Sequence, residues 1–281
     1  PSQFGSPNNW IGGSSPGARN VISGNAGDGI RISDPGSVGN LIQGNYIGTD
    51  AQGTRKLGNG NSGVYILDTS DTFIGTDVRG VSTPEIGNVI SGNGEDGFHL
   101  AGASRTLIRG NRIGIDANGV AALGNAHDGI SLVPGLSNRG SPDNVIGGDS
   151  TFIWNTVSGN GVNGIAIYGP ASTGNVLQGN YIGLDASRHG AIGNGGAGIY
   201  ISGASQVFIG TDTSGKADER WRNVIADNAG AGVWLSEARY VVVAGNDIGT
   251  EFGGMPAEGN GGSGIYVWKS IGVQIGSAVG G

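Results

Sequence analysis

The sequence predicts an all-β solenoid of about eight coils, built from short parallel strands. Three observations lead to this prediction. A motif of Gly, apolar residue, any residue, apolar residue recurs every 32 to 35 residues. The apolar residues alternate with polar ones in short bursts and do not follow helical spacing. Finally, 60 of the 281 residues are Gly, which indicates frequent turns because Gly weakens the interiors of helices and strands.

Each copy of the motif supplies one strand. The copies open at Gly29, Gly63, Gly97, Gly129, Gly164, Gly198, Gly232 and Gly264. The first apolar column contains Ile30, Val64, Phe98, Ile130, Ile165, Ile199, Val233 and Ile265. The second contains Ile32, Ile66, Leu100, Leu132, Ile167, Ile201, Leu235 and Val267. Residues two apart on a strand face the same side, so we expect both apolar columns to be buried in one continuous interior.

An Asn stands four residues before every opening Gly. The eight residues are Asn25, Asn59, Asn93, Asn125, Asn160, Asn194, Asn228 and Asn260. Asn tolerates left-handed backbone conformations, and its amide both donates and accepts hydrogen bonds. We therefore predict a ladder in which each Asn side chain bonds to its counterpart in the neighbouring coil.

Three short strings identify the type of solenoid. The units Asn20-Val-Ile-Ser-Gly-Asn25, Asn40-Leu-Ile-Gln-Gly-Asn45 and Gly87-Asn-Val-Ile-Ser-Gly-Asn93 resemble the repeats of right-handed parallel β-helix proteins. This pectate-lyase-like superfamily includes large bacterial surface and secreted proteins. The resemblance implies a right-handed parallel β-helix and a secreted or cell-surface location. It implies no single activity, because the scaffold carries lyases, epimerases, glycosidases, adhesins and passive stalks.

The repeat covers nearly the whole chain. We expect one β-helix domain over 1–281, with a partial coil at 1–28, full coils over 29–263 and a partial coil at 264–281. Solenoids need polar caps over their terminal coils, and neither end of this sequence resembles a cap. The expectation is therefore a fragment of a longer chain.

Composition excludes several classes of partner. The net charge is −7 with 15 Lys and Arg residues, so a nucleic-acid partner is not expected. The sequence contains no run of 18 apolar residues, so no membrane span is expected. The absence of Cys excludes disulfides and thiolate metal sites. The remaining candidates are a polysaccharide, a protein partner, or neighbouring domains of the parent chain.

Acidic residues recur at two positions of the coil. Three precede an opening Gly, and four lie in equivalent loops: Asp28, Asp96 and Asp128, and Asp50, Asp116, Asp185 and Glu251. Loop acids two coils apart are separated by roughly 10 Å at ~4.8 Å per coil. A shared Ca²⁺ needs six to eight converging oxygens. We predict that these acids form turns and that the protein has no cofactor, with bound Ca²⁺ as the alternative.

One position in each coil points outward between the two apolar columns. It contains Arg31, Tyr65, His99, Ser131, Ala166, Tyr200, Trp234 and Tyr266, and Tyr168 and Trp268 lie two residues further along their strands. Exposed aromatic side chains can stack on sugar rings or pack against a partner. We predict a binding face formed by Tyr168, Tyr200, Trp234, Tyr266 and Trp268. The alternative is the ordinary preference of aromatic residues for strands.

The sequence presents no concentrated catalytic motif. Candidate groups are Arg31, Tyr65 and His99, with Asp68, Asp71 and Arg105 just beyond them, and they are loosely grouped. We therefore assign no catalytic residue. The regular loops favour a structural or adhesive surface solenoid that contacts carbohydrate or protein, because an active site normally interrupts the pattern of its scaffold. The alternative is a carbohydrate-active enzyme, a polysaccharide lyase, epimerase or glycosidase, on the same scaffold.

Overall fold

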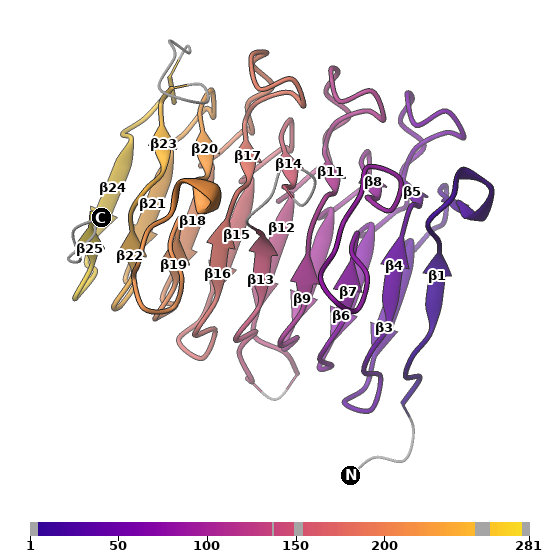
Figure 1. The fold of residues 1–281 in the computed structure, drawn as a ribbon, viewed down its shortest axis with the longest axis horizontal. Coiled ribbons are helices and arrows are strands. Elements are labelled where there is room, and N and C mark those ends of the chain that lie inside the picture. Colours follow the sequence, from indigo (N-terminus) through magenta and orange to yellow (C-terminus); the bar gives the residue numbers. More distant parts are fainter. Residues whose placement is uncertain (1–4, 137, 149–153, 251–258, 277–281) are drawn as a thin grey trace.

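The computed structural model describes residues 5–136, 138–148, 154–250 and 259–276. Within these ranges the chain forms 25 short strands and two single-turn 3₁₀ helices, η1 (Pro16–Ala18) and η2 (Glu219–Trp221). None of the helices in these ranges is long and apolar enough to cross a membrane. The strands belong to three parallel sheets, which we call A, B and C. Along the chain, each coil contributes one strand to sheet C, then one to sheet A and then one to sheet B (Figure 1).

The sheets contain nine, eight and eight strands. Sheet A consists of β1 (Trp10–Gly12), β4 (Leu41–Gln43), β7 (Phe73–Ile74), β10 (Leu107–Ile108), β13 (Val145–Gly147), β16 (Val176–Gln178), β19 (Phe208–Ile209), β22 (Val242–Val243) and β25 (Gln274–Ile275). Sheet B consists of β2 (Val21–Ile22), β5 (Tyr46–Ile47), β8 (Val89–Ile90), β11 (Arg112–Ile113), β14 (Thr156–Val157), β17 (Tyr181–Ile182), β20 (Val224–Ile225) and β23 (Asp247–Ile248). Sheet C consists of β3 (Ile30–Ser33), β6 (Val64–Leu67), β9 (Phe98–Ala101), β12 (Ile130–Val133), β15 (Ile165–Tyr168), β18 (Ile199–Ser202), β21 (Val233–Ser236) and β24 (Ile265–Trp268).

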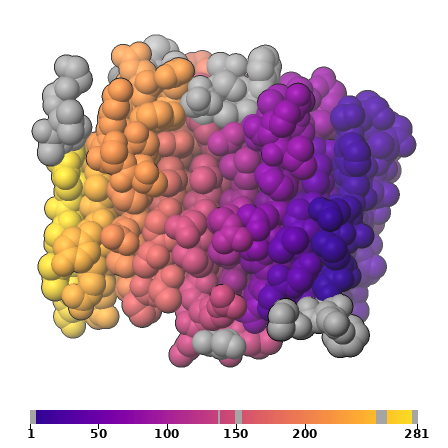
Figure 2. Space-filling model, turned by 60° about the horizontal axis from the view of Figure 1, so that its bottom comes forward, coloured from indigo at the N-terminus to yellow at the C-terminus, as the bar shows by residue number. Residues whose placement is uncertain are grey.

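Every strand pairs in parallel with its counterpart one coil away. In sheet C, for example, Ile130 lies opposite Ile165, and Leu132 lies opposite Ile167. The coils therefore stack in register along the long axis, and Figure 2 shows them as successive bands of colour. The predicted parallel β-helix is confirmed, and its strand numbers agree with about eight coils.

The two apolar columns form the interior. Fourteen of the sixteen residues are buried, and Phe98, Leu100 and Ile130 are completely inaccessible. The prediction was wrong for the last coil, where Ile265 is half-buried and Val267 is 41% exposed. The reason is that β24 is the edge strand of sheet C, and no described coil stacks over it.

The predicted Asn ladder runs between sheets B and C. Each Asn Nδ2 donates to the Oδ1 of its counterpart in the next coil at 2.8–2.9 Å, from Asn25 through to Asn260. Six of the eight residues are buried, whereas Asn25 is exposed and Asn260 is half-buried. These two exceptions occupy the first and last rungs, which have a neighbouring Asn on one side only. The ladder prediction is confirmed.

A second Asn ladder, which the sequence analysis missed, runs between sheets A and B. Its residues are Asn20, Asn45, Asn88, Asn111, Asn155, Asn180, Asn223 and Asn246, joined by side-chain bonds of 2.8–3.1 Å. Because loops of different length enter successive coils, the separation between neighbours changes between 23 and 44 residues. The spacing of this ladder repeats only over every second coil, at 66 to 69 residues, so the period of one coil does not mark it in the sequence.

The opening Gly residues are required by close packing between coils. A Cβ atom built on Gly63 would lie 2.5 Å from Cγ2 of Ile90 and 2.8 Å from Nδ2 of Asn93 and from the carbonyl oxygen of Gly97. These distances are shorter than a real Cβ contact allows. Any side chain here would push the ladder and the neighbouring strand apart.

The loops that follow β5, β11 and β17 project from one edge of the stack (Figure 1). They also contact one another, because the Ala117 amide donates to the Gly53 carbonyl and the Ala186 amide donates to the Gly119 carbonyl, both at 2.8 Å. The loops thus form a second, outer stack beside sheet B.

Candidate functional site

The outward positions of sheet C form one continuous row. Strand register places the predicted outward residues directly opposite one another across all eight strands, in the order Arg31, Tyr65, His99, Ser131, Ala166, Tyr200, Trp234 and Tyr266. The two apolar columns on the other side of the sheet keep this row straight, because each strand buries its alternate residues in the same register.

The last three residues of the row, Tyr200, Trp234 and Tyr266, are aromatic, and together with Tyr168 from the next outward row we call them the aromatic strip. Ring centroids lie 5.7 Å apart for Tyr168 and Tyr200, 5.2 Å for Tyr200 and Trp234, and 5.6 Å for Trp234 and Tyr266. The rings are steeply inclined to one another, at 57° to 72°. Trp234 is 39% exposed and Tyr266 is 42% exposed. The strip therefore presents a ridge of partly exposed rings four coils long.

Trp268 lies beside the aromatic strip in the next outward row. Its strand partner is Ser236, and the Nζ of Lys269 lies 4.2 Å from the centroid of its ring. Tyr168 belongs to this second row as well, opposite Ser202, but its ring reaches back to contact Tyr200. The structure thus brings together four of the five predicted binding residues and places Trp268 at their flank.

The N-terminal half of the row is polar and charged. Arg31 lies 4.4 Å over the ring of Tyr65, which stacks on His99 at 5.0 Å and 19°. The next residues belong to a group that we call the polar cluster, namely Asp96, His99, Asp128 and Ser131. Asp96 Oδ2 accepts from Ser131 Oγ at 2.6 Å and lies 2.7 Å from His99 Nδ1.

The hydrogen bonds of the polar cluster orient His99. With Nδ1 protonated, the imidazole donates to Oδ2 of Asp96, which also accepts from Ser131 Oγ. No described residue bonds to Nε2, and the His99 side chain is 26% exposed. The contact with Asp96 therefore holds the ring by one nitrogen, and the other nitrogen has no partner among the described residues.

Asp128, a carboxyl group of the polar cluster, has a raised pKa. Burial raises its pKa, the neighbouring charge of Asp96 raises it further, and hydrogen bonds from Asn163 oppose both effects. The Tyr168 hydroxyl lies 3.4 Å from Asp128 Oδ2, and burial together with this carboxylate raises the pKa of Tyr168. Tyr168 thus joins the polar cluster to the aromatic strip.

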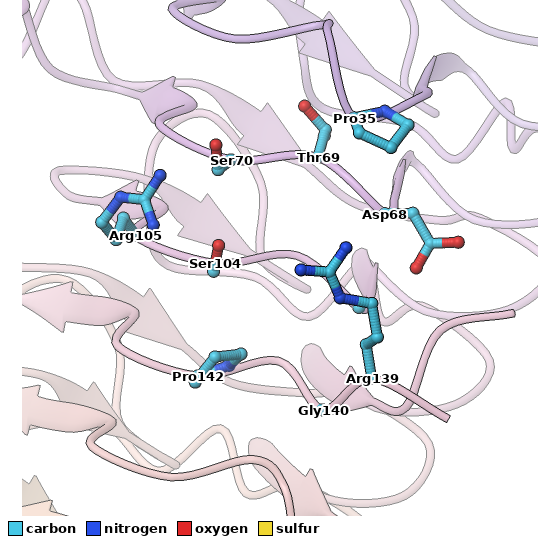
Figure 3. Close-up of a pocket in the computed structure, with 10 residues that line it drawn as sticks. Pro35, Asp68, Thr69, Ser70, Ser104, Arg105, Arg139, Gly140 and Pro142 are labelled. Carbon is cyan, nitrogen blue, oxygen red and sulfur yellow. The ribbon is translucent and has the colours of Figure 1, made fainter. Parts of the chain in front are cut away.

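A separate hollow of about 370 Å³ lies at the corner between sheets C and A. Its lining includes Asp68, which directly follows β6, as well as Ser104, Arg105 and Arg139 (Figure 3). Arg105 pairs with Asp71 through two bonds of 2.8 Å, which lower the pKa of that carboxyl group. The Oδ1 of Asp68 is buried and has no described partner.

The loosely grouped candidates of the sequence analysis therefore belong to two places. Arg31, Tyr65 and His99 form a stack on the face of sheet C. Asp68 and Arg105 line the hollow instead, around the corner from that face. The cluster that does form around His99 uses Asp96 and Asp128, which the sequence analysis had interpreted as turn formers. Residues three apart lie on opposite faces of a regular strand, so the spacing of Asp96 and His99 gave no signal for this contact.

The described loop acids Asp50, Asp116 and Asp185 form turns, as predicted, whereas the acids that precede an opening Gly bond between coils. Asp50 Oδ1 accepts from the amides of Thr54 and Arg55, and Asp116 Oδ1 accepts from those of Val120 and Ala121. Asp185 accepts a loop amide in the same manner. The acids that precede an opening Gly accept hydrogen bonds from amides of neighbouring coils, namely Asp28, Asp96 and Asp128. Glu251 lies outside the described residues. In the described part of the chain, no three His, Cys, Asp or Glu side chains are grouped so that they could hold a metal ion.

Comparison with known proteins gives similarity in fold. No protein-family model matches the sequence, and no curated protein matches it. Among solved structures, the periplasmic alginate epimerase AlgG shares 14% identity over 84% of this chain and 44% of its own, with a TM-score of 0.47. The A-module of the Azotobacter vinelandii mannuronan C-5 epimerase AlgE4 shares 16% identity over 89% of this chain and 59% of its own, with a TM-score of 0.42. The Dettilon tailspike protein shares 17% identity over 89% of this chain and 48% of its own, with a TM-score of 0.43.

The chain spans less than half the length of AlgG. At these identities the likeness concerns the path of the chain, and the activities of those proteins do not transfer to this one. The stacked strands and the two Asn ladders are observed in the chain itself. On these grounds the chain is a parallel β-helix protein.

Proposed function

We propose that the chain is a rigid β-helix scaffold that binds a polysaccharide along the outward face of sheet C, outside the cytoplasm. The aromatic strip is the observation that carries the proposal. Its rings contact one another over four coils and are partly exposed, so they can pack against the apolar faces of sugar rings. An exposed aromatic patch without a ligand would favour unwanted association in solution.

The charge of the face favours a neutral polysaccharide. Asp96 and Asp128 are buried beside the part of sheet C between the aromatic strip and Tyr65. The whole protein has a net charge of −7, which also repels a polyanion. Hydroxyl groups of a neutral sugar can instead form hydrogen bonds with the partly exposed imidazole of His99.

The binding proposal is tested with the double variant Trp234→Ser, Tyr266→Ser. Wild-type protein and variant are titrated with neutral, amino-substituted and acidic polysaccharides by calorimetry. We expect the wild type to bind a neutral polysaccharide and the double variant to bind at least 10-fold more weakly, a loss of about 1.4 kcal/mol. Tyr240→Ser is the matched control, because Tyr240 is an exposed aromatic residue outside sheet C.

Two results contradict the binding proposal. One is that the wild type binds none of the polysaccharides. The other is that the double variant remains folded, as shown by circular dichroism and thermal unfolding, and binds as tightly as the wild type. A large loss of stability without a loss of binding would leave the strip as structural packing.

The polar cluster supports a second candidate function, acid–base catalysis on the bound polysaccharide. A positioned imidazole can transfer protons in glycoside hydrolysis, and His99 is held by Asp96 through Nδ1 with its side chain 26% exposed. The test measures the release of reducing sugar ends by the wild type and by His99→Gln. We expect release that the variant abolishes, with only a small loss of polysaccharide affinity from the missing His99 contact. Absence of release from every polysaccharide that binds contradicts the catalytic candidate and leaves the binding proposal intact.

A further inference from the structure

A small pocket on a different side of the β-helix has a composition unlike the rest of the surface. It lies over sheet B, where Arg112, Thr156 and Tyr181 are opposite one another on β11, β14 and β17. Trp154 and the loop residue Arg188 complete the principal lining, and the pocket encloses about 130 Å³. We call these five residues the cationic pocket. None of them belongs to the aromatic strip or to the polar cluster.

Two guanidinium groups face this pocket in a protein whose net charge is −7. Arg188 lies 4.9 Å from the centroid of the Trp154 ring and 5.2 Å from that of Tyr181. The Arg112 guanidinium makes no hydrogen bond or ion pair with any residue that the structure describes. The nearby loop carboxylate of Asp116 is engaged with Asn118 and with the amides of its own loop.

The aromatic wall of the cationic pocket is preformed. The rings of Trp154 and Tyr181 meet edge to face, with centroids 4.7 Å apart and planes at 79°. Such an arrangement is favourable for aromatic pairs and holds both side chains in place. The pocket thus has a fixed apolar side next to its two positive charges.

The hydroxyl of Tyr181 is a further unassigned group. Tyr181 is only 5% exposed, and its hydroxyl oxygen is buried with no described hydrogen-bond partner. Burial raises the pKa of this hydroxyl, and the charge of Arg188 opposes that shift. The group is therefore a neutral O–H donor, and a buried donor without an acceptor is unfavourable in a folded protein.

We propose that the cationic pocket binds the carboxylate of a small organic acid or of the terminal unit of an acidic glycan. A planar guanidinium matches the two oxygens of a carboxylate, and the Tyr181 hydroxyl supplies one more donor. The carbon skeleton of the ligand lies against the Trp154 ring. The volume of about 130 Å³ suits a single small unit with its carboxylate. This site is independent of polysaccharide binding on sheet C.

The test uses ligand-observed NMR and calorimetry with defined probes. Glucuronate and N-acetylneuraminate represent sugar acids, succinate represents a simple organic acid, and glucose and inorganic phosphate are the neutral and non-carboxylate controls. We expect at least one carboxylate to bind in the millimolar range or tighter, with no binding of glucose and weaker binding of phosphate. A preference for the sugar acids over succinate identifies the glycan source, and the reverse preference identifies a small acid.

Two variants assign the binding to this pocket. Arg112→Gln should weaken the bound carboxylate at least 10-fold, and Tyr181→Phe should weaken it several-fold. Because no described residue bonds to the Tyr181 hydroxyl, Tyr181→Phe should also leave thermal stability equal or higher, which separates lost binding from lost fold. Trp234→Ser on the aromatic strip should have no effect on carboxylate binding.

Three outcomes would overturn the proposal. The first is that no carboxylate binds at about 10 mM, a concentration high enough to detect a weak site. The second is an unchanged carboxylate affinity in Arg112→Gln. The third is that phosphate binds as tightly as every carboxylate. The last result would indicate a general anion site without carboxylate selectivity.

Discussion

The two halves of the outward face of sheet C share one backbone and differ in chemistry. The N-terminal half displays Arg31, Tyr65 and His99 above the carboxylates of the polar cluster. The C-terminal half displays the aromatic strip. Strand pairing is continuous and parallel across both halves, so the backbone does not cause the difference.

The uniform parts of the molecule lie beneath this face. Phe98 under the polar half and Ile199 under the aromatic half are both completely buried, and one Asn ladder passes under both. The inward residues and the ladder therefore hold the fold, whereas the outward row is free to vary. A scaffold of this kind can place acid–base groups next to a sugar-stacking surface without altering its core.

The largest effect is expected from the shared ladder. Asn125→Ala removes the bonds that Asn125 makes with Asn93, Asn160 and the Ile90 carbonyl, all of them buried. We expect a loss of about 1–3 kcal/mol in the free energy of unfolding, because buried partners lose their bonds. Asn194→Ala, under the aromatic half, should cost the same.

The control for the ladder is Asn61→Ala, since Asn61 is exposed at the same turn. Its free energy of unfolding should change by about 0.5 kcal/mol at most. Denaturant midpoints measure all three variants. Equal midpoints for Asn61→Ala and Asn125→Ala, or a loss confined to one half of the stack, would contradict a ladder that supports both halves equally.

Substitutions in the aromatic half should lower the free energy of unfolding less than substitutions in the ladder do. Trp234→Ala removes two ring contacts, to Tyr200 and to Tyr266, from a side chain that is already 39% exposed. Each such contact contributes about 0.5–1.5 kcal/mol, and partial exposure reduces the sum, so we expect a loss of about 1–2 kcal/mol by thermal unfolding together with the loss of polysaccharide binding. A loss of stability larger than that of Asn125→Ala would mean that the strip serves the fold more than it serves a ligand.

The polar half should show a pH dependence that the aromatic half lacks. Burial raises the pKa of Asp128 in the folded protein, so the folded state keeps this proton to higher pH than the unfolded chain. The stability contributed by the neutral form is complete below the ordinary carboxyl pKa and is lost as the pH rises through the raised value. Asp128→Asn should remove this decline and be more stable than the wild type at neutral pH.

Asp212→Asn provides a control of opposite sign. Asp212 accepts hydrogen bonds from Ser214 and Lys216 in an exposed loop, and the Ser214 bond is the main cause of its lowered pKa. The wild-type protein therefore loses this contribution as the pH falls through the lowered value. Urea unfolding from pH 3 to pH 8 compares the variants. If the free energy of unfolding of Asp128→Asn still declines as the pH rises, Asp128 is excluded as the source of that decline.

The smallest effect is expected at the corner hollow. Arg105 and Asp71 form a bidentate pair, but their side chains are 57% and 40% exposed. Exposed pairs contribute about 0–1 kcal/mol and are screened by salt, so Arg105→Ala should lower stability only slightly. Its effect should decrease further in 1 M NaCl. A loss as large as that of Asn125→Ala would show that the hollow supports the stack.

Much of this structure could be predicted from the sequence because its repeat is nearly constant between sheets B and C. The Asn residues from Asn25 to Asn260 keep a spacing of 32 to 35 residues, and this spacing reveals their ladder. The ladder through Asn88 and Asn111 was missed because the inserted loops conceal its period. The exposure of Val267 was missed because it depends on whether another coil lies above it.

The sequence by itself determined the parallel solenoid, its two buried columns, the ladder between sheets B and C, and the outward row of sheet C. These features follow from short-range alternation and a regular repeat, which act identically in every coil. Only the tertiary structure decided that Asp96 orients His99, that Tyr168 reaches Tyr200 from another row, and that Arg112 and Tyr181 share a pocket with Trp154. These contacts join residues of different rows and loops, and their distances depend on side-chain direction and loop path, which the repeat does not specify.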